Sequence, residues 1–301
     1  MLKQCIEVFE ILDSASANGH KVKELFQKYG NVDVQVSKIN GTNGSTDFVR
    51  ILIKGKNGKS EGGTSPTLGI TGRLGGLGAR PEITGFVSDG DGAFAALVTG
   101  LKILDMSYKG DALSGDVIVT THICPNAPTI PHYPVALMDS PVDTAIINEL
   151  EVKDEIDAVL SVDTTKGNKV LNSKGFAITS TVKEGYILKV SDDLLNIMMR
   201  VTGRMPVVLP ISMQDITPYG NGIYHLNSIM QPSVATKAPV VGVAITTEIP
   251  VAGCATGATH IYDVEMTSRF LVEVAKDFTS GLCNFFDHDE FGRLIDLYGS
   301  M

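Results

Sequence analysis

Continuous apolar runs, separated by segments with helical spacing, constrain the fold of this chain most strongly. The predicted strands 116–121, 158–163 and 239–246 are apolar through their centres rather than alternating with polar residues. A strand of this kind must be covered on both faces of its sheet. The sequence therefore predicts an α/β fold: a three-layer sandwich with a central mixed, mainly parallel sheet and helices on both sides.

The remaining elements complete the expected order along the chain. Apolar residues at helical spacing predict helices at 4–29 (with a break at Asn18-Gly19), 92–104, 142–151, 192–203 (capped by Ser191) and 264–278. Strands 32–37 and 48–54 flank the turn residues 40–44 and predict a hairpin. Extended segments are expected at 176–182, 186–190 and 205–211. Since no linker or repeat interrupts the pattern, residues 1–301 are expected to form one domain.

Residues 55–88 carry glycines at a density found nowhere else in the chain. Two interpretations stay open: tight turns around a site, where backbone approaches closely, or a flexible surface loop. The segment contains neither a GxxxxGK[ST] loop nor a GxGxxG between strand and helix. No nucleotide cofactor is therefore expected.

Charge and composition narrow the possible partners. A net charge of −9 argues against nucleic acid, and no apolar window is long enough to span a membrane. Glu7 and Glu10 interrupt the start of the chain, so no signal peptide is expected. The four cysteines are scattered without metal-site spacing, which fits reduced thiols in the cytoplasm. We expect a cytoplasmic protein that acts on a small molecule or short peptide and that is capable of homo-oligomerisation.

Polar residues that follow buried strands are the candidates for chemistry, because ligands of open parallel sheets bind beyond the carboxyl ends of the strands. Asp89 and Asp91 precede the helix at 92–104 in the segment Ser88-Asp89-Gly90-Asp91-Gly92. They are either metal-ligating carboxylates in a glycine turn or plain helix N-caps. Asp163 ends a buried strand, and it either serves a site or caps the next turn.

Two histidine-containing segments complete the candidate site. His122 and Cys124 follow the strand at 116–121 and, two residues apart in extended backbone, should point the same way. Both residue types ligate transition metals, although a core histidine beside a buried thiol is the alternative. His260 follows a glycine-rich loop, and Asp263 is interpreted as a cap of the final helix.

Taken in order, these segments resemble the co-catalytic zinc peptidase clan of aminopeptidases and aminoacylase-like deacylases. The segment 88–96 is similar to the clan's bridging-aspartate motif, which implies that Asp89 bridges metals. Asp163 matches the aspartate ligand that ends the following strand, and His260 matches the late histidine. The absence of room for a lid domain after Asp163 favours the aminopeptidases. The chain also resembles an uncharacterised bacterial and archaeal family with the motif His122-Ile123-Cys124-Pro125-Asn126-Ala127-Pro128.

The departures from the clan are as informative as the matches. Its first ligand, a His in His-x-Asp, is expected near Gly72-Arg73-Leu74-Gly75, yet no histidine lies between His20 and His122. The clan's Glu-Glu pair falls at residues 122–124 and is absent, so the usual general base is missing. These differences leave room for at most one zinc or another divalent metal.

The candidate ligands of a mononuclear site are Asp89, His122, Cys124, Asp163 and His260. Asp89, His260 and one of His122 or Cys124 would make a three-ligand zinc site with an open position. Asp91, Asp163 and His132 are the candidate general bases. The leading hypothesis is a metal-dependent hydrolase of peptide or other amide bonds with an altered site. The alternative is a metal-free member of the fold that binds a small molecule or performs non-hydrolytic chemistry. A purely structural role is weaker, because clustered Asp, His and Cys residues are costly if unused.

Overall fold

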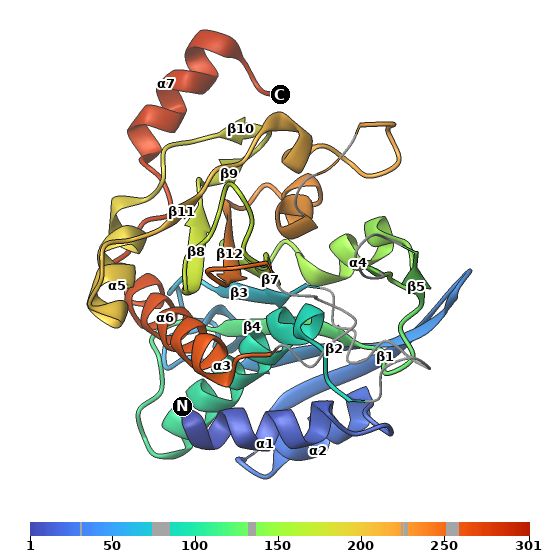
Figure 1. Ribbon diagram of the computed structural model, residues 1–301. Helices are drawn as coiled ribbons and strands as arrows, with labels where there is room; N and C mark the ends of the chain where they lie inside the picture. Colours follow the sequence, from blue (N-terminus) through green and yellow to red (C-terminus); the bar gives the residue numbers. More distant parts are fainter. Residues whose placement is uncertain (31, 74–84, 132–136, 224, 226–227, 251–258) are drawn as a thin grey trace.

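The computed structural model describes residues 1–301 apart from 31, 74–84, 132–136, 224, 226–227 and 251–258. A twisted central sheet runs through the molecule, with helices packed against it (Figure 1). The main path of strands has the order β1-β2-β4-β3-β7-β12-β8-β11, and a short pair, β9 and β10, joins it at β12. The pairs β4–β3, β3–β7 and β7–β12 are parallel, so the centre of the sheet is parallel as predicted.

The strand bounds show where the predictions were accurate. The path and the short pair that joins it comprise β1 (Asp33–Gly41), β2 (Gly44–Ile53), β3 (Leu68–Gly72), β4 (Val117–Ile123), β7 (Ala158–Thr164), β8 (Gly175–Thr179), β9 (Val182–Lys183), β10 (Tyr186–Ile187), β11 (Val208–Leu209) and β12 (Val240–Thr246). A separate hairpin consists of β5 (Thr129–Ile130) and β6 (Leu137–Met138). The expected N-terminal hairpin is confirmed as the antiparallel pair β1–β2.

The helices likewise follow the apolar spacing. They are α1 (Leu2–Leu12), α2 (Gly19–Gln27), α3 (Asp91–Tyr108), α4 (Thr144–Glu151), α5 (Asp192–Thr202), α6 (Ile261–Thr279) and α7 (His288–Tyr298), with short 3-10 helices at Lys59–Glu61, Ser88–Gly90, Met213–Ile216 and Ser228–Val234. The break expected at Asn18-Gly19 is confirmed, because the Asn18 side chain accepts the Lys21 N–H and begins α2. Ser191 caps α5 in the same way, as predicted.

The continuous apolar runs are explained by cores on both faces of the sheet. On one face, Leu160 and Val243 belong to a large core that includes residues of α1, α3 and α6. On the other face, the neighbouring strand residues Val159 and Val240 belong to a second core, which includes Ile229 and Met230 of the Ser228–Val234 helix. Successive residues of a strand point to opposite faces of the sheet, so the residues on both faces of these strands must be apolar. The predicted three-layer α/β architecture is therefore confirmed.

The elements that were not predicted include β3 and α7. The glycine-rich segment contains β3, a fully buried strand at the centre of the sheet, rather than only turns. Its glycines masked the apolar pattern: a Cβ at Gly69 would come within 2.9 Å of Ile156. The helix α7 was missed as well; none of its residues is buried, and it extends away from the sheet (Figure 1). None of the described helices is long and apolar enough to cross a bilayer.

Candidate active site

The candidate site lies where β3 and β7 end and α3 begins. Asp89 is part of the 3-10 helix Ser88–Gly90 that leads into α3, and Asp163 is the penultimate residue of β7. The close approach of these elements depends on Gly92, because a Cβ at this position would overlap the Val162 carbonyl oxygen of β7. The parallel sheet thus brings Asp89 and Asp163 to one edge, although they are far apart in sequence.

Asp89 and Asp163 interact electrostatically at this edge. Burial, reinforced by the negative charge of Asp163, raises the pKa of Asp89 to about 6. Burial also raises the pKa of Asp163, against the lowering effect of its hydrogen bonds. Asp163 accepts from the Ser228 hydroxyl (2.7 Å) and from the Thr164 N–H (2.7 Å). Only Oδ1 of Asp163 thus caps the next turn, as the alternative interpretation held. Oδ2 is bonded to the Ser228–Val234 helix.

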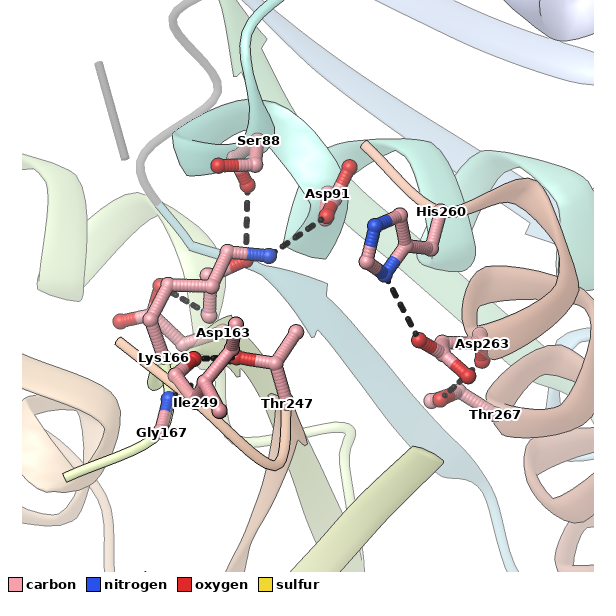
Figure 2. Close-up of polar contacts among 11 residues, drawn as sticks. Ser88, Asp91, Asp163, Lys166, Gly167, Thr247, Ile249, His260, Asp263 and Thr267 are labelled. Atoms are coloured by element: carbon pink, nitrogen blue, oxygen red, sulfur yellow. Dashed lines mark hydrogen bonds and ion pairs between the residues drawn. The ribbon is translucent and has the colours of Figure 1, made fainter. Parts of the chain in front are cut away.

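Asp91 is paired with a lysine that the sequence analysis did not single out. The Lys166 Nζ lies 3.4 Å from Asp91 Oδ2, and Asp91 is almost completely buried (Figure 2). Burial raises the pKa of Asp91 to about 7, while the Lys166 ammonium and, less strongly, the Thr259 hydroxyl lower it. The N-cap residue of α3 is Gly90, and no side chain caps this helix. The plain N-cap interpretation of Asp89 and Asp91 therefore fails.

A buried ion pair lies within electrostatic reach of Asp163. Arg73, the residue after β3, donates to the carboxylate of Glu151 and to the Asn148 side chain (3.0 Å), both on α4. The positive charge of Arg73 lowers the pKa of both Asp163 and His122, so the guanidinium lies within electrostatic reach of both side chains. Arg73 stands where the resemblance led us to expect the His-x-Asp ligand. A permanent positive charge occupies this region in place of a metal-binding imidazole.

His122 lies within β4 rather than after it, which corrects the predicted end of that strand. Its Nδ1 is 3.0 Å from the Thr46 hydroxyl, which itself donates to the Ile123 carbonyl (3.1 Å). A hydroxyl has one proton, so Thr46 accepts from His122 Nδ1–H, and the neutral ring carries its lone pair on Nε2. Burial, with a smaller effect of Arg73, lowers the pKa of His122 to about 4. The ring is neutral at physiological pH.

Cys124 and His122 both line one small hollow beside Met138, as the extended spacing predicted. The Cys124 thiol lies 3.6 Å from the Ser45 carbonyl oxygen, and burial raises its pKa. A thiol that is held protonated is a poor nucleophile and a poor metal ligand. The interpretation of Cys124 as a buried thiol thus agrees with its surroundings.

His260 is the N-cap residue of α6, and its ring is more than half exposed. Its Nδ1 lies 3.3 Å from Asp263 Oδ2, so Asp263 orients the ring from the first turn instead of capping the helix as expected (Figure 2). The third candidate base, His132, lies outside the described residues.

The five predicted ligands are only partly brought together. Across the described parts of the chain, no three His, Cys, Asp or Glu side chains are grouped closely enough to hold a metal ion. Asp89, with His260 and either His122 or Cys124, therefore does not form the expected three-ligand set. What the fold does assemble is a looser set of three buried or half-buried carboxylates: Asp89 interacts electrostatically with both Asp91 and Asp163, and Lys166 pairs with Asp91.

The charges of this group fit a divalent cation. Three carboxylates and one ammonium leave two negative charges when all are ionised, and the Arg73–Glu151 pair adds none. Asp91 Oδ1 is also buried and receives no well-aligned hydrogen bond from any described residue. Oxygen donors of this kind suit Mg²⁺ or Mn²⁺, which are commonly held by one or two carboxylates and several waters. The residues present thus fit such an ion better than the zinc that the resemblance implied.

Sequence reasoning missed Lys166, Arg73, Glu151 and Ser228. Two of them carry a signal that could have been used: Lys166 follows β7 by two residues, and Arg73 directly follows β3. Both positions lie beyond the carboxyl end of a buried strand, the place where ligands bind. Glu151 and Ser228 carry no comparable signal, because only packing brings α4 and the 3-10 helix to this edge.

Comparisons with known proteins support the fold. The bottromycin maturation enzyme BotP, in a structure determined in complex with Mn, superimposes with a TM-score of 0.54 at 14% sequence identity. The likeness covers 92% of this chain and 70% of that one, and at this identity it concerns the fold alone. No curated protein matches. Residues 37–301 match a family described as "Protein of unknown function (DUF1177)", and the chain belongs to that family.

Proposed function

We propose that this chain is a divalent-cation-dependent hydrolase of peptide or other amide bonds, with Asp89 and Asp163 holding the cation. The observation that carries the proposal is the set of three carboxylates, Asp89, Asp91 and Asp163, near the ends of β3 and β7. Their combined negative charge is larger than the positive charge that Lys166 supplies. The likeness to a fold that binds Mn in BotP adds support. With only two protein ligands, we favour an oxygen-preferring ion such as Mn²⁺ over zinc.

The chain's own residues supply the remaining functions. Asp163 is held in place by Ser228 and Thr164, so its carboxylate is oriented before any ligand arrives. Asp91 is the favoured proton acceptor, because it follows Asp89 by two residues and its Oδ1 receives no well-aligned hydrogen bond from any described residue. A cation bound here would polarise an amide carbonyl and acidify a water.

Metal binding and hydrolysis test the proposal together. Protein purified without affinity-tag metal should bind Mn²⁺ in calorimetric titrations and cleave aminoacyl amides or short peptides only with the ion present. Asp163→Asn should remove both properties. Asp154→Asn, an exposed change at the opposite end of β7, should alter neither. Absence of Mn²⁺, Mg²⁺ and Zn²⁺ binding by the wild type would overturn the proposal.

A metal-free binding protein is the second candidate. It is favoured by the absence of a three-residue ligand set among the described residues and by the lysine that already neutralises part of the carboxylate charge. Under this hypothesis, a cationic or hydrogen-bonding small molecule would occupy the same edge of the sheet. Thermal shifts with small molecules in the presence of a chelator would reveal it.

We also propose that the protein works in the cytoplasm, where its buried thiols stay reduced. Its substrate would be a small molecule or short peptide, and self-association is the expected form of assembly.

A further inference from the structure

Lys166 places its ammonium near two carboxylates, Asp91 and Asp89, although most of its side chain is buried. Its side chain is 11% exposed, whereas Lys169 and Lys174, the next lysines along the chain, are exposed. Lysine is almost never buried unless it is paired, because removing an ammonium from water is costly. The fold therefore supplies a specific place for this charge.

The turn that carries Lys166 is tied to two other elements. The Thr164 hydroxyl donates to the Ser88 carbonyl (2.8 Å), which fixes the turn to the helix that contains Asp89. The Thr165 N–H donates to the Ile245 carbonyl (2.8 Å), and the Gly167 N–H donates to the Thr247 hydroxyl (3.0 Å). Figure 2 shows the Gly167–Thr247 contact beside the lysine stem, with Nζ directed at Asp91. Hydrogen bonds of the residues before and after Lys166 thus fix the backbone from which its side chain extends.

The Lys166 ammonium acts on two carboxylates at once. It forms the ion pair with Asp91, and its charge also lowers the pKa of Asp89. An ammonium has three donors and no acceptor, so it can serve neighbouring carboxylate oxygens as a compact cation does. Asp91 Oδ1 is buried and receives no well-aligned hydrogen bond from any described residue, so this oxygen can still accept a hydrogen bond or ligate a cation.

We propose that Lys166 acts as a built-in cation, whose ammonium fills a cation position beside Asp91 and limits the site to one divalent ion. This inference rests on the proposed cation site at Asp89 and Asp163 and deepens it. Lys166 is a positioning and charge-balancing residue. Without the charge of Lys166, the three carboxylates would attract a further divalent ion such as Mn²⁺.

Manganese stoichiometry tests the inference directly. Calorimetry and elemental analysis should give one Mn²⁺ per chain for the wild type, with the electron paramagnetic resonance spectrum of an isolated ion. Lys166→Met should bind a second Mn²⁺, with a spin-coupled spectrum, or bind the first at least about tenfold more tightly, because a like charge has been removed from the site. Lys166→Arg should keep the wild-type stoichiometry, and Lys169→Met is the matched surface control. If Lys166→Met fails to fold, Lys166→Gln provides a second neutral variant.

The outcomes separate this inference from the proposed function. One ion in both wild type and Lys166→Met, at equal affinity, overturns the built-in-cation role and leaves the proposed function standing. Two ions bound by the wild type would likewise overturn the role of Lys166 and leave the proposed function standing. No ion in the wild type but one in Lys166→Met supports the built-in cation and overturns the proposed hydrolase. No ion in either protein overturns both.

Discussion

The guanidinium of Arg73, at the end of β3, donates to the carboxylate of Glu151, at the end of α4, with both side chains buried. Burial raises the pKa of Glu151 to about 7, while the Arg73 charge lowers it. Glu151 Oε1 and Arg73 Nε find no hydrogen-bond partner among the described residues. The pair is therefore an incompletely satisfied buried contact that joins the central strand to a helix on one face.

Breaking this ion pair should destabilise the protein strongly. Glu151→Leu should lower the free energy of unfolding by about 3–5 kcal/mol, because it leaves an uncompensated buried charge on Arg73. The double variant Arg73→Met with Glu151→Leu should recover most of that loss, since no buried charge remains. Urea denaturation measures both. The far more solvent-accessible pair Arg200–Asp277 is the control, and Asp277→Asn should cause a far smaller change. A double variant as unstable as Glu151→Leu would contradict the argument.

Acid should destabilise the protein through His122. Its pKa is about 4 in the folded protein, below its ordinary value of 6.5, so the unfolded chain binds the proton first as pH falls. Stability from this group is present above pH 6.5 and is lost between pH 6.5 and 4. The loss between pH 6.5 and 5 is about 2 kcal/mol, from about 1.4 kcal/mol per pKa unit.

The comparison with a variant isolates this effect from the buried acids, whose raised pKa values act in the opposite direction. His122→Gln should lack the acid-dependent loss in urea denaturation at pH 6.5 and 5. The exposed His20→Gln should behave as the wild type does. Equal pH dependence in the wild type and His122→Gln would show that the ring is not held neutral.

The approach of α3 to the sheet depends on the missing side chain at Gly92. Gly92→Ala should cost about 1–3 kcal/mol, because its Cβ meets backbone atoms of β7 that cannot move aside easily. The same change should weaken Mn²⁺ binding, since it displaces the helix start that carries Asp89. Gly292→Ala in α7, where a Cβ meets nothing within 4 Å, should be neutral or slightly stabilising. Thermal unfolding of the two variants provides the comparison.

Ser228 should influence cation affinity without being a ligand. Its hydroxyl donates to Asp163 Oδ2 and fixes the orientation of that carboxylate. Ser228→Ala should weaken Mn²⁺ binding about 10-fold, the lower end of effects seen when a ligand loses its supporting hydrogen bond. Ser233→Ala, in the same 3-10 helix but bonded to the Met230 carbonyl, should leave affinity unchanged. Equal affinities in calorimetry would show that Ser228 does not orient the ligand.

Local patterns were sufficient for most of the fold. Runs such as Val117–Val119 are apolar at every position, so they specified strands that are covered on both faces before any contact was known. Asn18 and Ser191 specified helix beginnings, because their side chains satisfy free N–H groups nearby in sequence. The sequence did not predict β3, because glycines interrupt its apolar pattern. These glycines leave space for neighbouring elements that are distant in sequence.

The sequence alone determined that Asp163 lies at the end of a buried strand and that Asp89 leads into a buried helix. Tertiary structure alone decided the electrostatics around them. It buried Lys166 against Asp91, placed Arg73 where an imidazole was expected, and committed His122 Nδ1 to Thr46. Charge and hydrogen-bond partners depend on distances of a few ångströms between segments far apart in the chain. Periodicity along the sequence carries no information about such distances.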